Sequence, residues 1–309
     1  MNRKLLTAYS VKYDPFSPEV PVEALLVTPK VEHFCWRVKQ LAGEGGFALV
    51  SGEAGLAKSG TLRILQDQLE RLRDVKVAIL SRPQSGPADF YRELGDIYGV
   101  QLAPHNRWAG SKVLRERWQA HIESALYRPA LIIDEAQEMA PAVLNELRLL
   151  GSTQLDSHLL LTVVLCGDHR LLEALRLPQL VPLGSRLRVR LVHEPLTPQE
   201  LRDHLLHRLT AAGNANLMTA ELVQTLCEHA AGNLRILMTM ASELLDAAVQ
   251  RETAQLDEKL YFEIFAVPQH LEPARPRSAK HPATSTAAGP AQAALALRSQ
   301  PAAAAGARR

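Results

Sequence analysis

The sequence predicts an α/β protein in which a parallel sheet flanked by helices is followed by a small all-helical domain. From about residue 45 to residue 191, short apolar runs alternate with longer amphipathic stretches, as strands and helices do around a mostly parallel sheet. After Pro195 the apolar residues recur only at spacings of three and four, which is typical of helices. We therefore expect two structured regions of different architecture.

Four apolar runs are rich in Leu, Val and Ile and short enough to be strands covered on both faces. They lie at 46–51, 75–80, 130–133 and 159–166, and a fifth short strand is expected at 187–192. Periodicity alone does not distinguish such runs from buried helix, so their alternation with amphipathic stretches supports the assignment.

The helical region has a clear first boundary. Thr197 supplies a capping hydroxyl, Pro198 occupies the first helical position, and Glu200 can reach back to the cap. We expect a helix to begin there, with further helices over 221–231 and 234–250, so that residues 197–265 form a small bundle.

The bulk composition excludes several classes of protein. Three cysteines lie far apart, without the spacing of a zinc site or the density of a disulfide scaffold, which favours a reducing, cytoplasmic setting. No segment has the length and apolar character of a signal peptide or membrane span. A net charge of +2 is too small to indicate a polyanionic partner by itself. Past residue 267, the Ala, Pro and Arg content predicts a disordered tail.

A glycine-rich loop follows the first predicted strand and precedes an amphipathic helix, as a phosphate-binding loop does. It comprises Gly52, Glu53, Ala54, Gly55, Leu56, Ala57, Lys58, Ser59 and Gly60. In such a loop, backbone amides and the helix N-terminus face the phosphates, the lysine reaches the β and γ oxygens, and the hydroxyl ligates Mg²⁺. Lys58 and Ser59 fill the last two roles.

Ala57 departs from the usual pattern, which has glycine before the lysine. Its methyl group either crowds the phosphate or is accommodated by a negative φ, because only left-handed geometry demands glycine.

Two carboxylates follow an apolar strand about 75 residues downstream of the loop, in the Walker B form LIIDE. At the carboxyl edge of a parallel sheet, Asp134 can hold Mg²⁺ through water and Glu135 can polarise the attacking water. An acidic strand end facing solvent is the alternative interpretation, and the pairing with the glycine-rich loop disfavours it.

With these motifs in this order, the chain resembles the ExeA-like branch of AAA+ ATPases, which includes transposition helper ATPases of the TniB and TnsC kind. The resemblance covers most of residues 10–250. Besides the P-loop and LIIDEAQEM, it includes YDPF at 13–16, LTVVLCGD at 161–168, SRLRVR at 185–190, PLTPQE at 195–200 and AGNLR at 231–235.

The resemblance implies further site residues. Tyr13 and Phe16 would lie near the adenine, and Arg235 would be the sensor-2 residue. Asp168 would stand close to the sensor-1 position, where similar members usually carry a neutral polar residue, often glutamine.

Thr162 or His169 is the alternative to Asp168. Arg186 would be the arginine finger offered to a neighbouring subunit, although Arg188 and Arg190 alternate with it and would share one side of a regular strand. A solvated strand face is the alternative interpretation of these three arginines.

These features divide the chain into four parts. They are an N-terminal segment that contributes to the nucleotide pocket (1–44), a P-loop ATPase α/β domain (45–195), a helical lid domain (196–266) and the disordered tail (267–309). His204 and His207 lie at a helical spacing of three without a further ligand nearby, so we expect surface positions rather than a metal site.

The sequence favours an ATP-binding and ATP-hydrolysing protein with Mg²⁺ as cofactor. By resemblance it would form an ATP-dependent oligomer, bind double-stranded DNA through phosphates and recruit a transposase, because secretion-type relatives usually add a membrane span where this chain has its tail. A secretion-related ExeA-type ATPase, a nucleotide-binding switch with weak hydrolysis and a plain helical interaction protein are the alternatives.

Overall fold

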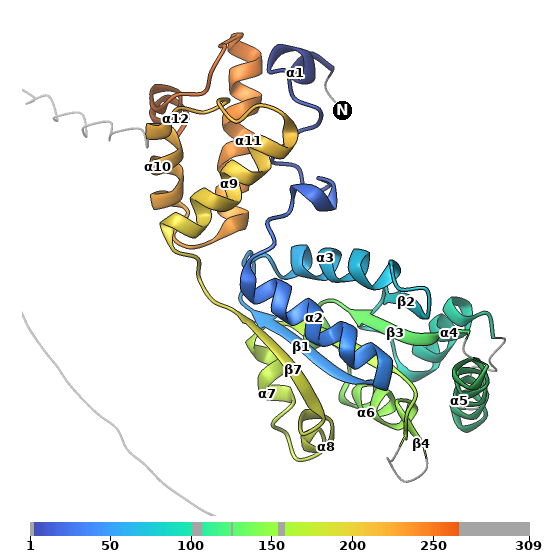
Figure 1. Cartoon of the computed structure of the whole chain (residues 1–309). Helices are drawn as coiled ribbons and strands as arrows, with labels where there is room; N and C mark the ends of the chain where they lie inside the picture. The colour runs from blue at the N-terminus through green and yellow to red at the C-terminus, as the bar shows by residue number, and fades with distance from the viewer. Residues whose placement is uncertain (1–2, 101–106, 125, 154–157, 266–309) are drawn as a thin grey trace, which may run out of the picture. The chain divides into compact units, whose positions relative to one another are not determined.

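A five-stranded parallel sheet organises the larger part of the protein (Figure 1). The computed structural model describes residues 3–100, 107–124, 126–153 and 158–265. The strands are β2 (Val75–Leu80), β3 (Arg128–Ile133), β6 (Thr162–Gly167), β1 (Gly46–Gly52) and β7 (Leu187–His193), in that spatial order. A separate antiparallel pair joins β4 (Ser152–Thr153) to β5 (His158–Leu159). The predicted fold class is confirmed.

Helices precede, connect and follow the strands (Figure 1). The helices that precede and connect the strands are α1 (Arg3–Ala8), α2 (Pro29–Glu44), α3 (Lys58–Glu70), α4 (Pro87–Tyr98), α5 (Arg107–Glu123), α6 (Pro141–Leu150), α7 (His169–Ala174) and α8 (Val181–Gly184), with 3-10 turns η1 (Val22–Ala24) and η2 (Ala136–Glu138). The C-terminal helices are α9 (Pro198–Ala212), α10 (Ala220–His229), α11 (Leu234–Arg251) and α12 (Glu258–Phe265). The tail predicted at 267–309 lies outside the described residues.

Helices bury both faces of the sheet, as the continuous apolar strands require. On one face, Val38 of α2 and Leu65 of α3 pack against β1, β3 and β6. On the other face, Phe90 of α4, Trp118 of α5 and Leu147 of α6 form a second core. The loops at the carboxyl ends of the strands therefore extend from a rigid scaffold.

The C-terminal helices have their own core, which includes residues from the start of the chain. Leu205, Leu226 and Leu237 come from three helices of this bundle, and Tyr9 and Phe16 are buried among them. The Tyr9 hydroxyl also donates to the carbonyl of Thr253 at 2.8 Å. The N-terminal segment thus packs against the helical bundle as well as preceding the sheet.

The first helix of the bundle begins at the predicted capping box. The backbone N–H of Glu200 donates to Thr197 Oγ1 at 3.2 Å, and the backbone N–H of Thr197 donates to Glu200 Oε2 at 2.8 Å. The backbone hydrogen bond from Thr197, together with the one from its hydroxyl, holds the pKa of Glu200 below its ordinary value. Each of these two bonds gives a partner to a backbone N–H at the helix end that has none within the helix.

Four of the five predicted strands occur with bounds within two residues of those expected, and the run at 159–166 divides. Leu159 pairs with Ser152 in the short antiparallel pair, while the central strand begins only at Thr162. The backbone N–H of Leu160 donates to the carbonyl of Gly151 at 2.9 Å, so this part of the run pairs locally.

The expectation that three alternating arginines share one side is wrong, because β7 contains a bulge. Phe47 pairs with Leu187 and the next residue, Ala48, pairs with Val189, so Arg188 is an extra residue. Arg188 reaches Glu44 at the end of α2, at 3.2 Å. Arg190 instead donates to the carbonyl of Gly184 in α8, at 3.2 Å, on the opposite face.

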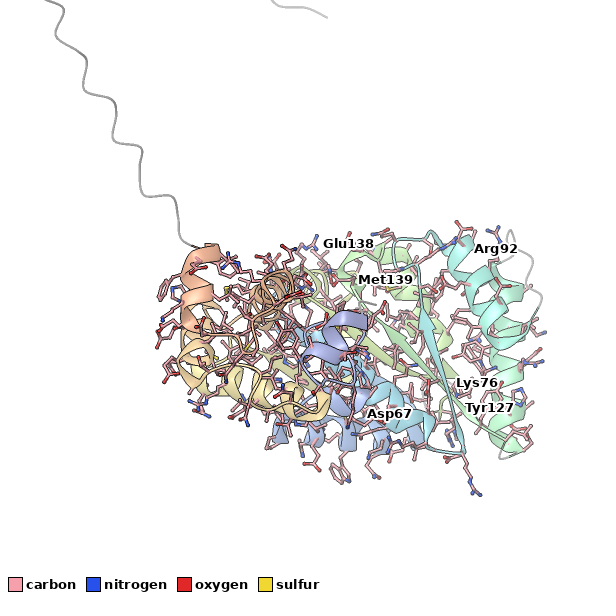
Figure 2. The ribbon with its side chains drawn as sticks, turned by 90° about the horizontal axis from the view of Figure 1, so that it is seen from above. Asp67, Lys76, Arg92, Tyr127, Glu138 and Met139 are labelled. Atoms are coloured by element: carbon pink, nitrogen blue, oxygen red, sulfur yellow. The ribbon has the colours of Figure 1, made fainter. Side chains whose placement is uncertain are left out.

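The outer edge of the sheet at β2 carries a lysine between two aromatic rings (Figure 2). Lys76 Nζ lies 5.5 Å from the ring centroids of both Tyr98 and Tyr127. The ammonium group is attracted to the faces of the two rings. A charged residue on an edge strand also discourages pairing with a strand of another molecule. Among the described residues, no helix has both the length and the hydropathy that a bilayer crossing requires.

Candidate active site

The P-loop connects β1 to α3 and packs directly against the start of the helical bundle. Gly55 has φ of +85°, and a Cβ there would lie 2.1 Å from Asn233 Oδ1. Asn233 donates from Nδ2 to the carbonyl of Ala54 at 3.0 Å and caps α11 with Oδ1. The backbone N–H of Arg235 donates to the carbonyl of Gly55 at 3.2 Å. Glycine is therefore required at this position for the bundle to approach the loop.

Ala57 has φ of +65° and ψ of 17°, so the alternative in which a negative φ accommodates its methyl group is excluded. This residue immediately precedes α3, and the amides of the following turn determine its geometry. A left-handed conformation costs a non-glycine residue roughly 1–2 kcal/mol. The methyl group packs against the core of the helical bundle, which offsets part of that cost.

The P-loop hydroxyl and the first Walker B carboxylate meet, although 75 residues separate them in sequence. Ser59 Oγ donates to Asp134 Oδ2 at 3.1 Å. Adjacent oxygen ligands of an octahedral Mg²⁺, at roughly 2.1 Å from the ion, lie about 3 Å apart, so this pair fits the ion as direct or water-bridged ligands. Asp134 Oδ1 accepts from the backbone N–H of Glu135 at 2.9 Å, which orients the carboxylate.

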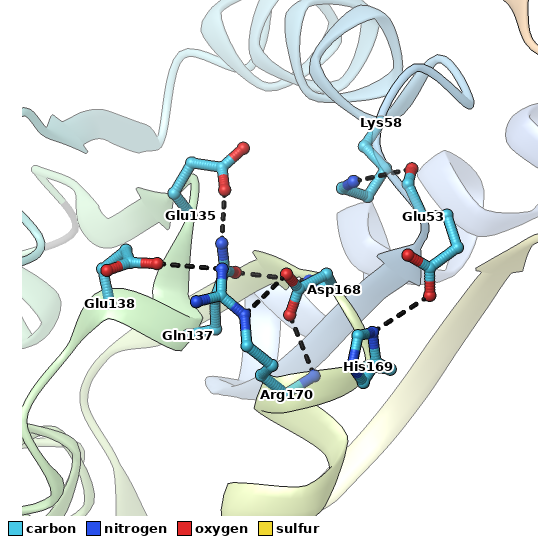
Figure 3. Close-up of polar contacts among 8 residues, drawn as sticks. All are labelled: Glu53, Lys58, Glu135, Gln137, Glu138, Asp168, His169 and Arg170. Atoms are coloured by element: carbon cyan, nitrogen blue, oxygen red, sulfur yellow. Dashed lines mark hydrogen bonds and ion pairs between the residues drawn. The ribbon is translucent and has the colours of Figure 1, made fainter. Parts of the chain in front are cut away.

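Lys58 is a cation with only 7% of its surface exposed, at the N-terminus of α3. Its Nζ donates to the carbonyl of Glu53 at 3.0 Å (Figure 3). No carboxylate among the described residues forms an ion pair with it. A buried ammonium at a helix N-terminus attracts an anion, and phosphate is the anion that this loop geometry binds.

Glu135 also adopts a left-handed conformation, with φ of +51°, at the start of η2. Its Oε2 accepts a hydrogen bond from Gln137 Nε2, as Figure 3 shows. Glu135 and Lys58 line the same cavity. The structure therefore brings the predicted base to the predicted phosphate site, and it adds Gln137, which the sequence did not single out.

Asp168 does not present a free negative charge. Its carboxylate caps α7 by accepting from the backbone N–H of Arg170, and it accepts from Arg170 Nε at 2.9 Å (Figure 3). Burial raises the pKa of Asp168, but the bonds from Arg170 outweigh this and hold the pKa below its ordinary value. Arg170 also pairs with Glu138 at 2.9 Å.

The two alternatives for the sensor position lie at different ends of β6. Thr162 is the first residue of the strand and pairs with Gly46, the first residue of β1. The P-loop follows the other end of β1, so Thr162 is excluded as the sensor residue. His169 Nδ1 lies 3.1 Å from Glu53 Oε1 and so contacts the P-loop itself.

Two neighbouring cavities surround the start of α3. The first, of about 640 Å³, is lined by Phe16, Lys58, Ser59, Glu135 and Arg235 among others. The second, of about 390 Å³, lies between η1, the end of β7 and α9, and it is mostly apolar. Both are lined by Leu25, Ala57, Gly60, Arg208 and Leu234, so they meet beside Ala57.

Two arginines hold the N-terminal segment at these cavities. Arg63 of α3 donates to the carbonyl of Pro18 at 2.9 Å, and Arg208 of α9 donates to that of Pro15 at 3.2 Å. Burial, together with the nearby charge of Arg63, lowers the pKa of Arg208. Phe16 lines the larger cavity, whereas Tyr13 packs against the cores, and neither residue lines the smaller cavity.

Arg235 lines the cavity that contains Lys58, as a sensor-2 residue would. Within the described part of the chain, its guanidinium forms no ion pair, so Arg235 is not held in a surface salt bridge. Arg186 lies between α8 and β7 and does not line either cavity. Its role as an arginine finger for a neighbouring subunit stays a prediction.

Two neutral imidazoles line the smaller cavity. Burial, with the charges of Lys58 and Lys30, lowers the pKa of His193 to about 4, and its Nε2 lies 3.0 Å from Thr61 Oγ1. Burial likewise lowers the pKa of His204 to about 4.

The surface position expected for His204 is wrong, since it shares the buried face of α9 with Leu201 and Leu205. Among the described residues, no group of three or more His, Cys, Asp or Glu side chains is placed to hold a metal ion.

Comparison with known proteins finds an AAA domain, a relative and structures of the same fold. Residues 41–175 match the AAA domain family. The general secretion pathway protein A of Aeromonas hydrophila is 32% identical over 211 residues, which cover 67% of this chain and 38% of that protein. The chain thus spans well under half the length of this relative.

Solved structures of low sequence identity share the fold. Cdc6p of Pyrobaculum aerophilum has a TM-score of 0.64 and 18% identity over 80% of this chain and 68% of that one. Drosophila ORC bound to DNA has a TM-score of 0.63 and 17% identity, covering 85% and 65%. Domain III of the Thermotoga maritima replication initiation protein DnaA has a TM-score of 0.55 and 18% identity, covering 81% and 97%.

Proposed function

Because this chain contains an AAA domain within an AAA+ P-loop fold, we propose that it binds ATP with Mg²⁺ and hydrolyses the γ-phosphate. The contact between Ser59 Oγ and Asp134 Oδ2 at 3.1 Å carries this proposal. It brings together a loop that binds phosphate and an acid that holds a metal, as phosphoryl transfer to water requires.

Each residue of the site has a chemical role in this proposal. Lys58 and the loop amides bind the phosphates, and Arg235 faces the same cavity. Ser59 and Asp134 would hold Mg²⁺, and the ion would supply positive charge to the phosphate oxygens. Glu135 accepts a proton from water as the water oxygen attacks the γ-phosphorus and the bond to ADP breaks.

The base of the nucleotide would occupy the smaller, mostly apolar cavity, which meets the phosphate cavity beside Ala57. Phe16, which lines the larger cavity, would close the nucleotide site from the N-terminal segment. The neutral ring of His193, a neighbour of Thr61, suits contact with an uncharged base.

Hydrolysis would depend on assembly, since Arg186 lies between α8 and β7 and does not line its own chain's nucleotide cavity. An arginine from a neighbouring copy can stabilise the charge that spreads over the γ-phosphate oxygens. Arg186→Ala should retain ATP binding and lose turnover in the assembled protein, and full turnover per subunit would contradict the proposal.

ATP affinity and steady-state turnover test the proposal directly. Lys58→Ala should lose binding, whereas Glu135→Gln should bind ATP normally and turn it over at least about a hundredfold more slowly. Retained ATP binding in Lys58→Ala would refute the site and favour an interaction protein. Tight binding without turnover in the parent, rescued in Ala57→Gly, would indicate a nucleotide switch instead.

For the biological role, we propose a DNA-associated regulator of transposition that recruits a transposase. The order of motifs from YDPF to AGNLR supports it, and the fold is shared with ORC bound to DNA. ATP-dependent mobility shifts on duplex DNA should weaken steeply between 50 and 200 mM salt, because the contacts would be to phosphates. Three free, buried thiols support a cytoplasmic location.

A secretion-related role is the second candidate, and the 32% identity to general secretion pathway protein A favours it. The same mobility assay separates the two roles. DNA binding that requires ATP favours the transposition role, and its absence at low salt with an active ATPase favours secretion.

A further inference from the structure

The side-chain amide of Gln137 is fixed at both ends (Figure 3). Its Nε2 donates to Glu135 Oε2, and its Oε1 accepts from the backbone N–H of Asp168 at 3.2 Å. An amide donates only through nitrogen and accepts only through oxygen, so these two contacts determine which end faces Glu135.

Gly167, at the end of β6, leaves room for the Gln137 side chain because it has no side chain of its own. A Cβ on Gly167 would lie 2.5 Å from Gln137 Oε1 and 2.9 Å from Leu171 Cδ2. Any larger residue at 167 would displace the amide. The anchoring of Gln137 therefore depends on a close approach that the backbone of β6 permits only with glycine.

A second contact fixes the same two segments to each other. Arg170 bonds to Asp168 at its own helix end and to Glu138 in η2, both at 2.9 Å. Gln137 and Arg170 thus join η2, which follows Glu135, to the start of α7. The only hydrogen bond from a side chain to the Glu135 carboxylate, among the described residues, comes from Gln137.

We propose that Gln137 is a positioning residue for hydrolysis, which holds one oxygen of the Glu135 carboxylate so that the other faces the attacking water. This inference rests on the proposed ATPase function.

Gln137→Ala should lower kcat about tenfold to a hundredfold, because a displaced catalytic group loses alignment with the water. ATP affinity should stay within about twofold, since neither contact of Gln137 is to the P-loop. Gln119→Ala is the matched control, because Gln119 also donates to a glutamate, Glu123, on the exposed face of α5. It should match the parent in both measurements.

Gln137→Glu distinguishes positioning from a general structural role. It keeps an oxygen to accept from Asp168 but places a second carboxylate against Glu135, which raises the proton affinity of the pair. The acidic limb of the kcat–pH profile should therefore move to higher pH by about one unit.

Gly167→Ala, which displaces the same amide, should reproduce the loss of kcat. A parent with turnover whose kcat and pH profile are unchanged in both Gln137 variants would overturn the inference. A parent without turnover under any condition would instead overturn the proposed function.

Discussion

The contact between the P-loop and the helical bundle makes Gly55→Ala a severe test of the site. A Cβ at this residue would overlap Asn233 Oδ1 at 2.1 Å, and φ of +85° is unfavourable for any side chain. Left-handed geometry costs about 1–2 kcal/mol. Displacing Asn233 costs about 1 kcal/mol for the cap of α11 and about 1 kcal/mol for its bond to Ala54. The free energy of unfolding should therefore fall by about 3 kcal/mol.

Chemical denaturation measures this change, and a second glycine of the same loop and helix provides the control. A Cβ on Gly60 would meet only Leu25 Cδ2, at 4.0 Å. Since Gly60 lies within α3, Gly60→Ala should leave the protein as stable or stabilise it by about 0.5–1 kcal/mol. If Gly55→Ala were within 0.5 kcal/mol of the parent, roughly the spread of ordinary surface substitutions, the described attachment of α11 to the P-loop would be refuted.

Three further predictions concern stability. His193 and His204 are neutral in the folded protein with pKa values of about 4, against 6.5 unfolded, so the unfolded chain binds more protons between these values. The free energy of unfolding should fall as pH drops from 6.5 towards 4, by at most about 3 kcal/mol for each histidine. Chemical denaturation of His204→Gln should show a free energy of unfolding that depends less steeply on pH. Thr197→Ala should lower the free energy of unfolding by about 1 kcal/mol through loss of the capping box, whereas a value near zero would contradict that geometry. Tyr91→Phe removes the 2.6 Å bond to the buried carboxylate of Glu146 and should cost about 1–3 kcal/mol, and an unchanged thermal midpoint would count against it.

Local patterns predicted much of the fold because the signals were strong and short-range. Apolar runs bounded by glycine or charge located the strands, and the capping box located the start of α9 to the residue. The P-loop and LIIDE motifs identified Ser59 and Asp134 as one site, since strands of a parallel sheet present their carboxyl ends together.

The misplaced residues depend on tertiary context that a pattern does not contain. The bulge at Arg188 arises from pairing with β1, so alternation along β7 gave the wrong faces. Ala57 adopts a positive φ because the loop and α3 impose it, against the preference of alanine. His204 is buried by packing of α9, although its spacing from Leu201 and Leu205 carried the signal.

Gln137 was overlooked because its contact with Asp168 joins two loops that are distant in sequence. Its place within LIIDEAQEM, two residues after Glu135, was the available signal. The arginines that hold the N-terminal segment, Arg63 and Arg208, bind backbone carbonyls and so leave no recognisable pair of opposite charges in the sequence.

A double-mutant cycle of Ser59→Ala and Asp134→Asn, measured as ATP affinity with and without Mg²⁺, tests most directly whether the two side chains hold one ion. With Mg²⁺, the two substitutions should be strongly non-additive, with a coupling of about 1 kcal/mol or more, because either one removes the same metal interaction. Without Mg²⁺, the coupling should vanish. Additive effects in Mg²⁺, or an ATP affinity of the parent that does not depend on Mg²⁺, would contradict a shared magnesium-bound triphosphate at this site.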